Sequence, residues 1–166
     1  MLYKKIFIFL YILMFSTSIF ANTPRSTGKF KNWESFIVET DKGKICFAQT
    51  VPTKRAPSSI QREKSKLFVT FRPSDEIKDE VSLTSGHDYK TSSVTASSGK
   101  RKYSFFSQKD FAWLLDDQEE RKFIQLMKKA TDIIVKARTT KGTETTDHYS
   151  MMGFTKAYNT AKKACK

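Results

Sequence analysis

Apolar and polar residues alternate over most of the chain, which predicts β-strands. The clearest case is 66–72, where Leu67, Val69 and Phe71 fall on one face before Pro73 ends the run. Similar short runs, rich in β-branched and aromatic residues, occupy 33–39, 45–50, 80–83, 103–106, 131–137 and 145–152. Asp-Lys-Gly-Lys separates the first two of these runs and predicts a β-hairpin.

Two stretches have helical character. Residues 118–129 follow Asp116 or Asp117, either of which can cap a helix, and they carry acids in the first turn and lysines in the last. The apolar face of this helix comprises Phe123, Ile124 and Met127. A second helix is predicted at 156–164, with Thr155 as its cap.

The remaining segments are rich in Pro, Ser and Thr. Residues 51–65 predict an exposed loop, and 91–100 predict either a loop or a weak edge strand. About seven antiparallel strands and two short helices place the fold in the mainly β class, as a sandwich or a partly open barrel. We expect a single domain of this kind over 33–166.

The first 21 residues have the three-part pattern of a secretory signal peptide. Two lysines precede an apolar run at 6–15, and small polar residues lead to Ala21, after which we expect cleavage; Ser18 is the alternative position. Crossing a bilayer takes roughly 20 apolar residues, so an uncleaved anchor is less favoured. Residues 22–32 are polar and predict a flexible leader. No later stretch is apolar enough to cross a membrane, so the processed chain is not expected to span one.

Export changes the interpretation of the two cysteines, Cys46 and Cys165. In an oxidising compartment, two cysteines in a small domain predict one structural disulfide. A redox pair or metal ligands would call for close spacing such as C-x-x-C, which this sequence lacks.

Without the signal peptide the chain has 28 Lys and Arg residues and 17 Asp and Glu residues, which gives a net charge of +11. Such a charge favours anionic surfaces. The basic residues form no single stripe, and an exported protein rarely meets nucleic acid, so we expect a solvated lysine-rich surface and no nucleic-acid partner.

No motif commits the chain to catalysis, and no cofactor is predicted. Gly-x-Ser-x-Gly, the P-loop and Gly-x-Gly-x-x-Gly are all missing from the sequence. His87 with Asp88 and Asp147 with His148 are the candidate functional residues, because two such pairs could hold a metal if they met in space. Their spacing matches no ligand motif, so we predict ordinary turn and strand-end histidines. A metal-dependent hydrolase around His87 and His148 is the alternative.

Aromatic residues are abundant in and beside the predicted strands. We expect the rings to pack in the core, and a stacking platform for sugars or bases is the alternative. The residues concerned are Trp33, Phe47, Phe68, Phe71, Phe105 and Trp113.

The order of local sequences along the chain carries a family resemblance. In sequence order these are Trp33, CFAQTVP at 46–52, LFVTFRP at 67–73, FAW at 111–113, FIQLMKKA at 123–130, KGTETTDHYSMMGFTKA at 141–157 and Cys165. This order resembles the invasion-associated locus B family of exported alphaproteobacterial proteins, from about Trp33 to Cys165. The chain departs from the family at Lys129-Ala130, where members often have a glycine.

The resemblance implies an exported, non-enzymatic cell-envelope protein that acts through its surface. Members are periplasmic or associated with the outer membrane, and the family name comes from a link to host-cell invasion. The resemblance brings no catalytic residues, cofactor or defined ligand. We therefore expect a periplasmic, outer-membrane-associated or secreted protein. Its partners are unknown, with outer-membrane or anionic envelope components as candidates, and a basic binder of anionic envelope glycans is a further alternative.

Overall fold

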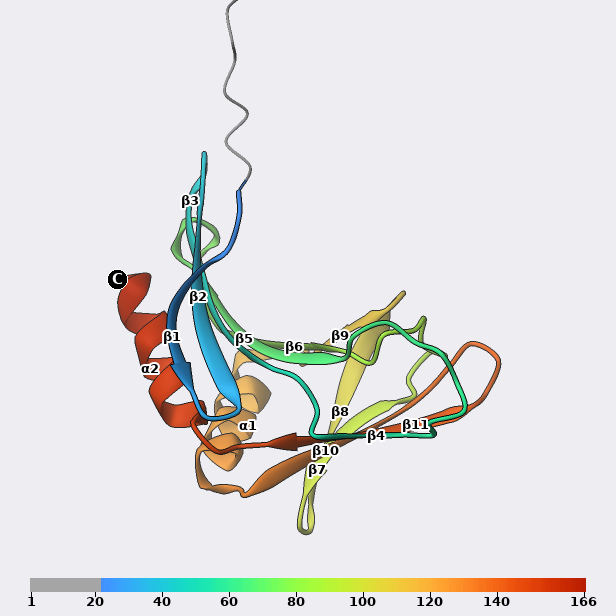
Figure 1. The fold of residues 1–166 in the computed structure, drawn as a ribbon. Coiled ribbons are helices and arrows are strands. Elements are labelled where there is room, and N and C mark those ends of the chain that lie inside the picture. Colours follow the sequence, from blue (N-terminus) through green and yellow to red (C-terminus); the bar gives the residue numbers. More distant parts are fainter. Residues whose placement is uncertain (1–21) are drawn as a thin grey trace, which may run out of the picture.

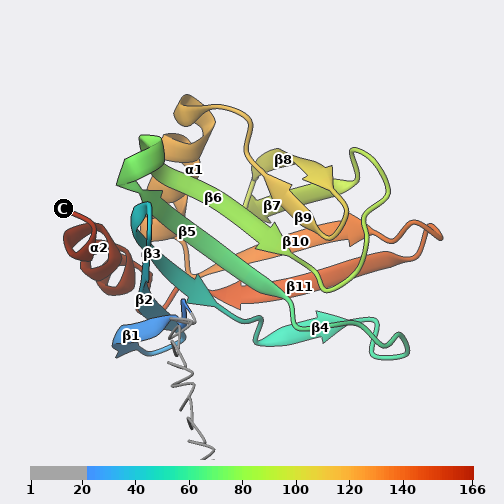
Figure 2. The ribbon, with the colours of Figure 1, turned by 90° about the horizontal axis from the view of Figure 1, so that it is seen from above.

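The computed structural model describes residues 22–166, so the predicted signal peptide at 1–21 lies outside the described residues. Eleven strands form one open antiparallel sheet in the order β1-β2-β3-β5-β6-β9-β8-β7-β10-β11-β4. The sheet curves strongly, so that β5 and β6 lie across the core from β10 and β11 (Figure 1, Figure 2). The mainly β class is confirmed, but about seven strands was too few.

The elements follow one another with short connections. The strands are β1 (Arg25–Phe30), β2 (Trp33–Thr40), β3 (Gly43–Thr50), β4 (Lys54–Ala56), β5 (Lys66–Arg72), β6 (Ile77–Thr84), β7 (Val94–Ser98), β8 (Arg101–Gln108), β9 (Phe111–Trp113), β10 (Asp132–Arg138) and β11 (Glu144–Ser150). The helices are the 3-10 turn η1 (Pro73–Asp75), α1 (Asp117–Lys129) and α2 (Phe154–Ala164).

Two segments expected to be irregular contain strands, and a third, expected to be a loop or a weak edge strand, contains an interior strand. Part of the predicted flexible leader is β1, which pairs with β2 along its length. The predicted loop at 51–65 contains β4, which is an edge strand on β11. The Ser/Thr-rich stretch at 91–100 contains β7, which lies inside the sheet between β8 and β10. The polar composition of these segments favoured loops. The segments are strands because neighbouring strands provide hydrogen-bond partners that a segment does not have on its own.

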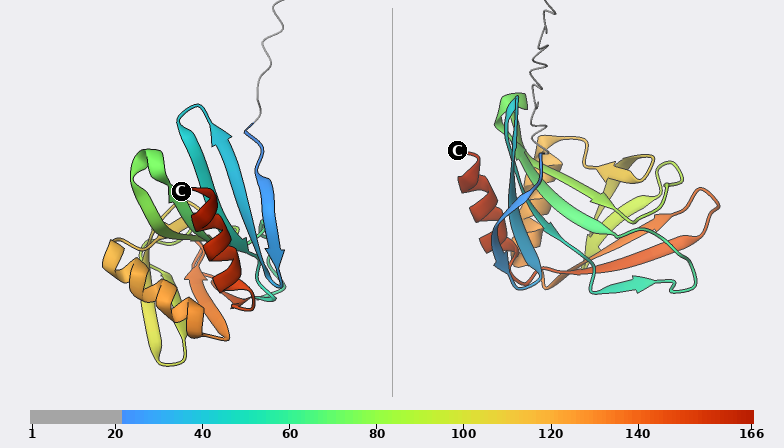
Figure 3. Two further views of the ribbon diagram at one scale, coloured as in Figure 1. Left: turned by 90° about the vertical axis from the view of Figure 1, so that its left-hand side faces the viewer. Right: turned by 45° about the horizontal axis from the view of Figure 1, so that its top comes forward.

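Both helices lie on the same face of the sheet, here called the core face (Figure 3). Helix α1 begins at the predicted N-cap Asp116, whose carboxylate accepts a hydrogen bond from the Glu119 amide at 2.8 Å. Helix α2 begins two residues earlier than predicted. Its N-cap is Gly153 rather than Thr155. A side chain at Gly153 would meet the Phe30 carbonyl oxygen at 1.8 Å, so this close approach requires glycine.

The disulfide between Cys46 and Cys165 is present and ties α2 to β3. The same helix packs Phe154 on Trp33, with ring centroids 4.8 Å apart, and Tyr158 on Phe71 at 5.5 Å. These contacts secure the C-terminus to the first half of the sheet.

The core face carries the apolar side chains expected from strand alternation. Leu67, Val69 and Phe71 of β5 are buried together, as predicted. Trp33 lies in the same core, and its indole Nε1 donates a hydrogen bond to the Ser150 carbonyl at 2.9 Å. This bond joins β2 to β11 across the curved sheet.

Candidate functional site

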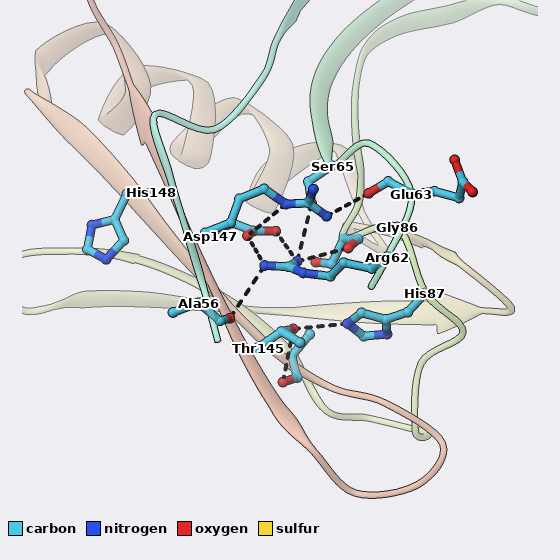
Figure 4. Close-up of polar contacts among 12 residues, drawn as sticks. Ala56, Arg62, Glu63, Ser65, Gly86, His87, Thr145, Asp147 and His148 are labelled. Carbon is cyan, nitrogen blue, oxygen red and sulfur yellow. Dashed lines mark hydrogen bonds and ion pairs between the residues drawn. The ribbon is translucent and has the colours of Figure 1, made fainter. Parts of the chain in front are cut away.

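The structure separates the four candidate residues instead of gathering them. Asp147 and His148 are consecutive in β11 and therefore point to opposite faces, with Asp147 buried and His148 on the outer face (Figure 4). His87 lies in the connection after β6 on the side of Asp147, and Asp88 is exposed. In the described residues no three His, Cys, Asp or Glu side chains are arranged to hold a metal ion.

Asp147 is engaged by an arginine that the sequence did not single out. The Arg62 guanidinium donates to both carboxylate oxygens, from Nη2 at 2.6 Å and from Nη1 at 2.8 Å. Both side chains are almost fully buried, with 2% and 1% of their surface exposed. A second arginine, Arg55, places its Nε 3.8 Å from the same carboxylate. The Asp147 carboxylate therefore belongs to a buried ion pair inside the fold.

The remaining donors of Arg62 hold the 51–65 connection against the sheet. Nη1 also donates to the Ser85 carbonyl at 2.9 Å and to the Ser65 hydroxyl at 3.3 Å, and Nη2 donates to the Ala56 carbonyl at 3.4 Å (Figure 4). All these partners belong to the protein. The Arg62–Asp147 pair is therefore a structural link between the long connection and β11.

Gly86 allows the same connection to approach closely. It has φ +73°, and a side chain there would meet the Glu63 carbonyl oxygen at 2.1 Å. The Glu63 amide donates to the Gly86 carbonyl at 2.9 Å. The space between these loops measures about 560 Å³ and opens widely to solvent.

His87 is also satisfied within the fold. Its Nδ1 lies 3.0 Å from the Asp88 carbonyl, and because a carbonyl only accepts, Nδ1 carries the hydrogen. Its Nε2 lies 3.0 Å from the Thr145 hydroxyl, which donates to the Ala137 carbonyl at 3.4 Å. This histidine connects the loop to β11, and the hydroxyl that it contacts is buried, with Thr145 only 1% exposed.

A second hollow, of about 700 Å³, lies between η1, β6 and the start of α1. Glu120 of α1 lines it, 8% exposed, and its carboxylate accepts a hydrogen bond from the Val81 amide at 3.0 Å. Burial raises the pKa of Glu120 to about 7, helped by the nearby carboxylates of Glu80 and Asp117. The hydrogen bond attaches α1 to the sheet, so we assign Glu120 a structural role with a pH-dependent strength.

A row of aromatic rings lies on the outer face of the sheet, where no helix of residues 22–166 packs against it. Phe36 stacks on Phe47 with ring centroids 5.2 Å apart, and Phe47 meets Phe68 at 6.2 Å. Phe68 then meets Phe111 at 6.3 Å, and Phe111 meets Trp113 at 5.9 Å. We call these five residues the aromatic row. All five are partly exposed, and both helices lie on the opposite face.

The row depends on a small residue in the strand between β5 and β9. Ser82 of β6 pairs in register with Phe68 on one side and with Trp113 on the other. Its short side chain lets the rings of Phe68 and Phe111 meet above it. Phe47, Phe68, Phe111 and Trp113 line an open, mostly apolar hollow of about 390 Å³, together with the Arg72–Glu80 ion pair. Phe106, 51% exposed, lies opposite Trp113 and extends the row onto β8.

The same outer face becomes basic beyond β8. Lys102, Ser104 and Phe106 alternate along β8 and so share a face, which joins the aromatic row to the next surface. That surface is a hollow of about 340 Å³ that includes Lys90, Lys102, Lys136 and Arg138, with Glu144 as its carboxylate. We call these four cations and Glu144 the basic groove. Glu144 lies 3.5 Å from Lys136 and 3.9 Å from Arg138, so positive charge remains in excess.

The sequence carried a signal for the aromatic row, but we expected these rings to pack in the core. Trp33, Phe71 and Phe105 are in the core as expected, but Phe47, Phe68 and Trp113 are on the outer face. In each of β3 and β5 the outer phenylalanine alternates with buried residues, at a position where an exposed sheet usually has a polar residue. No comparable signal marked Arg62, because an arginine in a polar connection is ordinarily solvated.

Comparisons with known proteins add no relative: no family model, no curated protein and no solved structure matches the chain. The resemblance to the invasion-associated locus B family therefore stays a prediction from the sequence. No helix in residues 22–166 is long and apolar enough to cross a membrane.

Proposed function

We propose that this chain is a non-enzymatic exported protein of the invasion-associated locus B type, which acts by binding through the outer face of its sheet. It works in the periplasm or at a host-cell interface. The observation that carries the proposal is the aromatic row, which is partly exposed on the face of the sheet opposite both helices. Contiguous exposed apolar surface on a soluble domain is a common mark of an interaction site.

The polar side chains support a binding role over catalysis. Asp147 and His87, two of the candidate residues, form their hydrogen bonds with other residues of the fold. His148 faces away from both. A hydrolase around His87 and His148 would need a shared pocket, and this geometry does not favour one.

The proposal is tested by gene deletion and complementation in the bacterium that encodes the protein. Deletion is expected to change envelope integrity or host-cell entry, and the wild-type gene is expected to restore it. A Phe68→Thr/Phe111→Thr gene should fail to restore it, because threonine keeps the strand propensity and removes the rings. Retention of the purified mature protein on isolated cell envelopes should fall in the same variant.

Two controls separate binding from folding and from catalysis. Met152→Ser removes an apolar side chain of similar exposure to Phe106, 57% against 51%, away from the row, and should behave as wild type. His87→Ala/His148→Ala should also complement fully. A ring variant that folds, restores the phenotype and stays on envelopes would overturn the proposal, and complementation failure of the histidine variant alone would favour the hydrolase.

A further inference from the structure

We propose that the aromatic row and the basic groove together bind a linear acidic polysaccharide, whose sugar rings stack on the aromatic row while its acidic groups reach the basic groove. This inference rests on the proposed binding function and names its ligand class.

The spacing suits a chain of sugar rings that crosses the strands. Neighbouring rings of the row are 5.2–6.3 Å apart, and they follow one another from β2 to β9. Phe36–Phe47 and Phe47–Phe68 join adjacent strands, which lie about 4.8 Å apart, whereas Phe68 and Phe111 approach one another across β6 and Phe111 and Trp113 share β9. All four spacings resemble the repeat of pyranose rings in an extended polysaccharide. Three of the pairs lie within 18–28° of parallel and Phe47 meets Phe68 at 66°, so the row is a stepped apolar surface on which the apolar faces of successive sugars can pack.

The positive charge beside the aromatic row favours an acidic polysaccharide over a neutral one. Lys66 places its Nζ 5.9 Å from the centre of the Phe68 ring, at the margin of the row. On the other side, the basic groove carries four cations against one carboxylate, and Ser93 and Thr95 add hydroxyl groups to its lining. β8 joins the two regions because it bears both Lys102 and Phe106. The processed chain as a whole carries +11, which attracts an anionic polymer over a long range.

Exposure and charge disfavour two other occupants of the row. The five rings are only partly exposed, and none of them is a fully exposed apolar side chain of the kind that inserts into a bilayer. A second copy of this chain would bring two strongly positive surfaces together, which opposes self-association.

The two tryptophans of the chain allow a direct binding assay. Trp113 belongs to the row, whereas Trp33 is fully buried and inaccessible to a soluble quencher. Alginate, a linear polyuronate, is expected to protect Trp113 from acrylamide quenching in a saturable way that weakens with salt. Polyphosphate of equal charge and a neutral linear glucan are each expected to bind at least tenfold more weakly than alginate.

Matched variants locate the contacts. Phe68→Thr/Phe111→Thr is expected to weaken alginate binding at least tenfold, and Lys102→Gln several-fold. Met152→Ser should leave binding unchanged. If the double variant does not fold, Phe106→Ser, whose side chain is half exposed, tests the same surface and should weaken binding several-fold.

Several results would overturn the inference. These are equal binding of alginate and polyphosphate, equal binding of alginate and neutral glucan, undiminished alginate binding by a folded ring variant, or tighter binding of single-stranded DNA or anionic vesicles than of alginate. If ring variants lose envelope retention but alginate does not bind, the ligand class is wrong and the proposed binding function survives. If ring variants keep envelope retention, the proposed function itself fails.

Discussion

Removing the carboxylate of Asp147 should be among the most destabilising single changes in the protein. Asp147→Asn keeps the shape of the side chain but withdraws the charge that faces the Arg62 guanidinium, whose side chain is 2% exposed. Arg62 stays protonated in any accessible environment, so the variant must hold an uncompensated buried charge or expose it by displacing the 51–65 connection.

The size of the effect follows from burial and geometry. Breaking a buried ion pair by removing one partner costs about 3–5 kcal/mol. The pair here is bidentate, with N–O distances of 2.6 and 2.8 Å, and Arg55 is a further nearby cation. We therefore expect a loss near the upper end of that range. A small domain has about 5–15 kcal/mol of stability in total, so this loss is a large fraction.

A double-mutant cycle isolates the pair. Arg62→Met should also destabilise, since the Ser85 and Ala56 carbonyls lose a donor. Arg62→Met/Asp147→Asn removes both charges, so we expect it to lose at least about 2 kcal/mol less than the sum of the two single variants. Urea denaturation of the oxidised protein, followed by tryptophan fluorescence, gives the free energy of unfolding of each variant.

Asp132→Asn is the matched control, because Asp132 is an exposed aspartate in the adjacent strand β10. It should change the free energy of unfolding by no more than about 0.5 kcal/mol. The reasoning is refuted if Asp147→Asn is as mild as Asp132→Asn, or if the two single changes simply add in the double variant.

Three further predictions concern other parts of the fold. Cys46→Ala and Cys165→Ala should each lower the free energy of unfolding by up to about 4–5 kcal/mol, because the bridge closes a loop of 119 positions; addition of reductant in the denaturation assay should affect the wild type and leave both variants unchanged. Glu120 has its pKa raised from 4.5 to about 7, so the folded state holds its proton more tightly, and stability should fall by about 2–3 kcal/mol as pH rises from 4.5 to 7. Glu120→Gln should remove most of that decline, and an unchanged pH profile in this variant would contradict the assignment. Gly86→Ala should lower stability by at least about 1 kcal/mol more than Gly99→Ala, since both have positive φ but only Gly86 faces a carbonyl oxygen at contact distance; equal losses in thermal melts would argue against the close approach.

An element could be predicted from the sequence when the interactions that form it lie within its own stretch of the chain. The 66–72 strand was predicted to the residue, and the cap of the first helix is one of the two predicted aspartates, because Leu67, Val69 and Phe71 alternate and Asp116 bonds its own helix. The strands β1 and β4 were missed, and β7 was offered only as a loop or a weak edge strand, because these polar sequences become strands only beside established neighbours. Thr155 was a plausible cap, but the approach of Phe30 moved the helix start to Gly153.

The sequence alone determined the mainly β class, the positions of most strands and both helices, and the pairing of two distant cysteines. Those properties follow from side-chain alternation, helix capping and the count of cysteines. Only the tertiary structure decided which residues meet: it placed Asp147 against Arg62, turned His148 away from His87, and aligned rings from separate strands into one row. The reason is that strand register and sheet curvature determine side-chain proximity across the sheet, and neither is encoded in any local stretch of the chain.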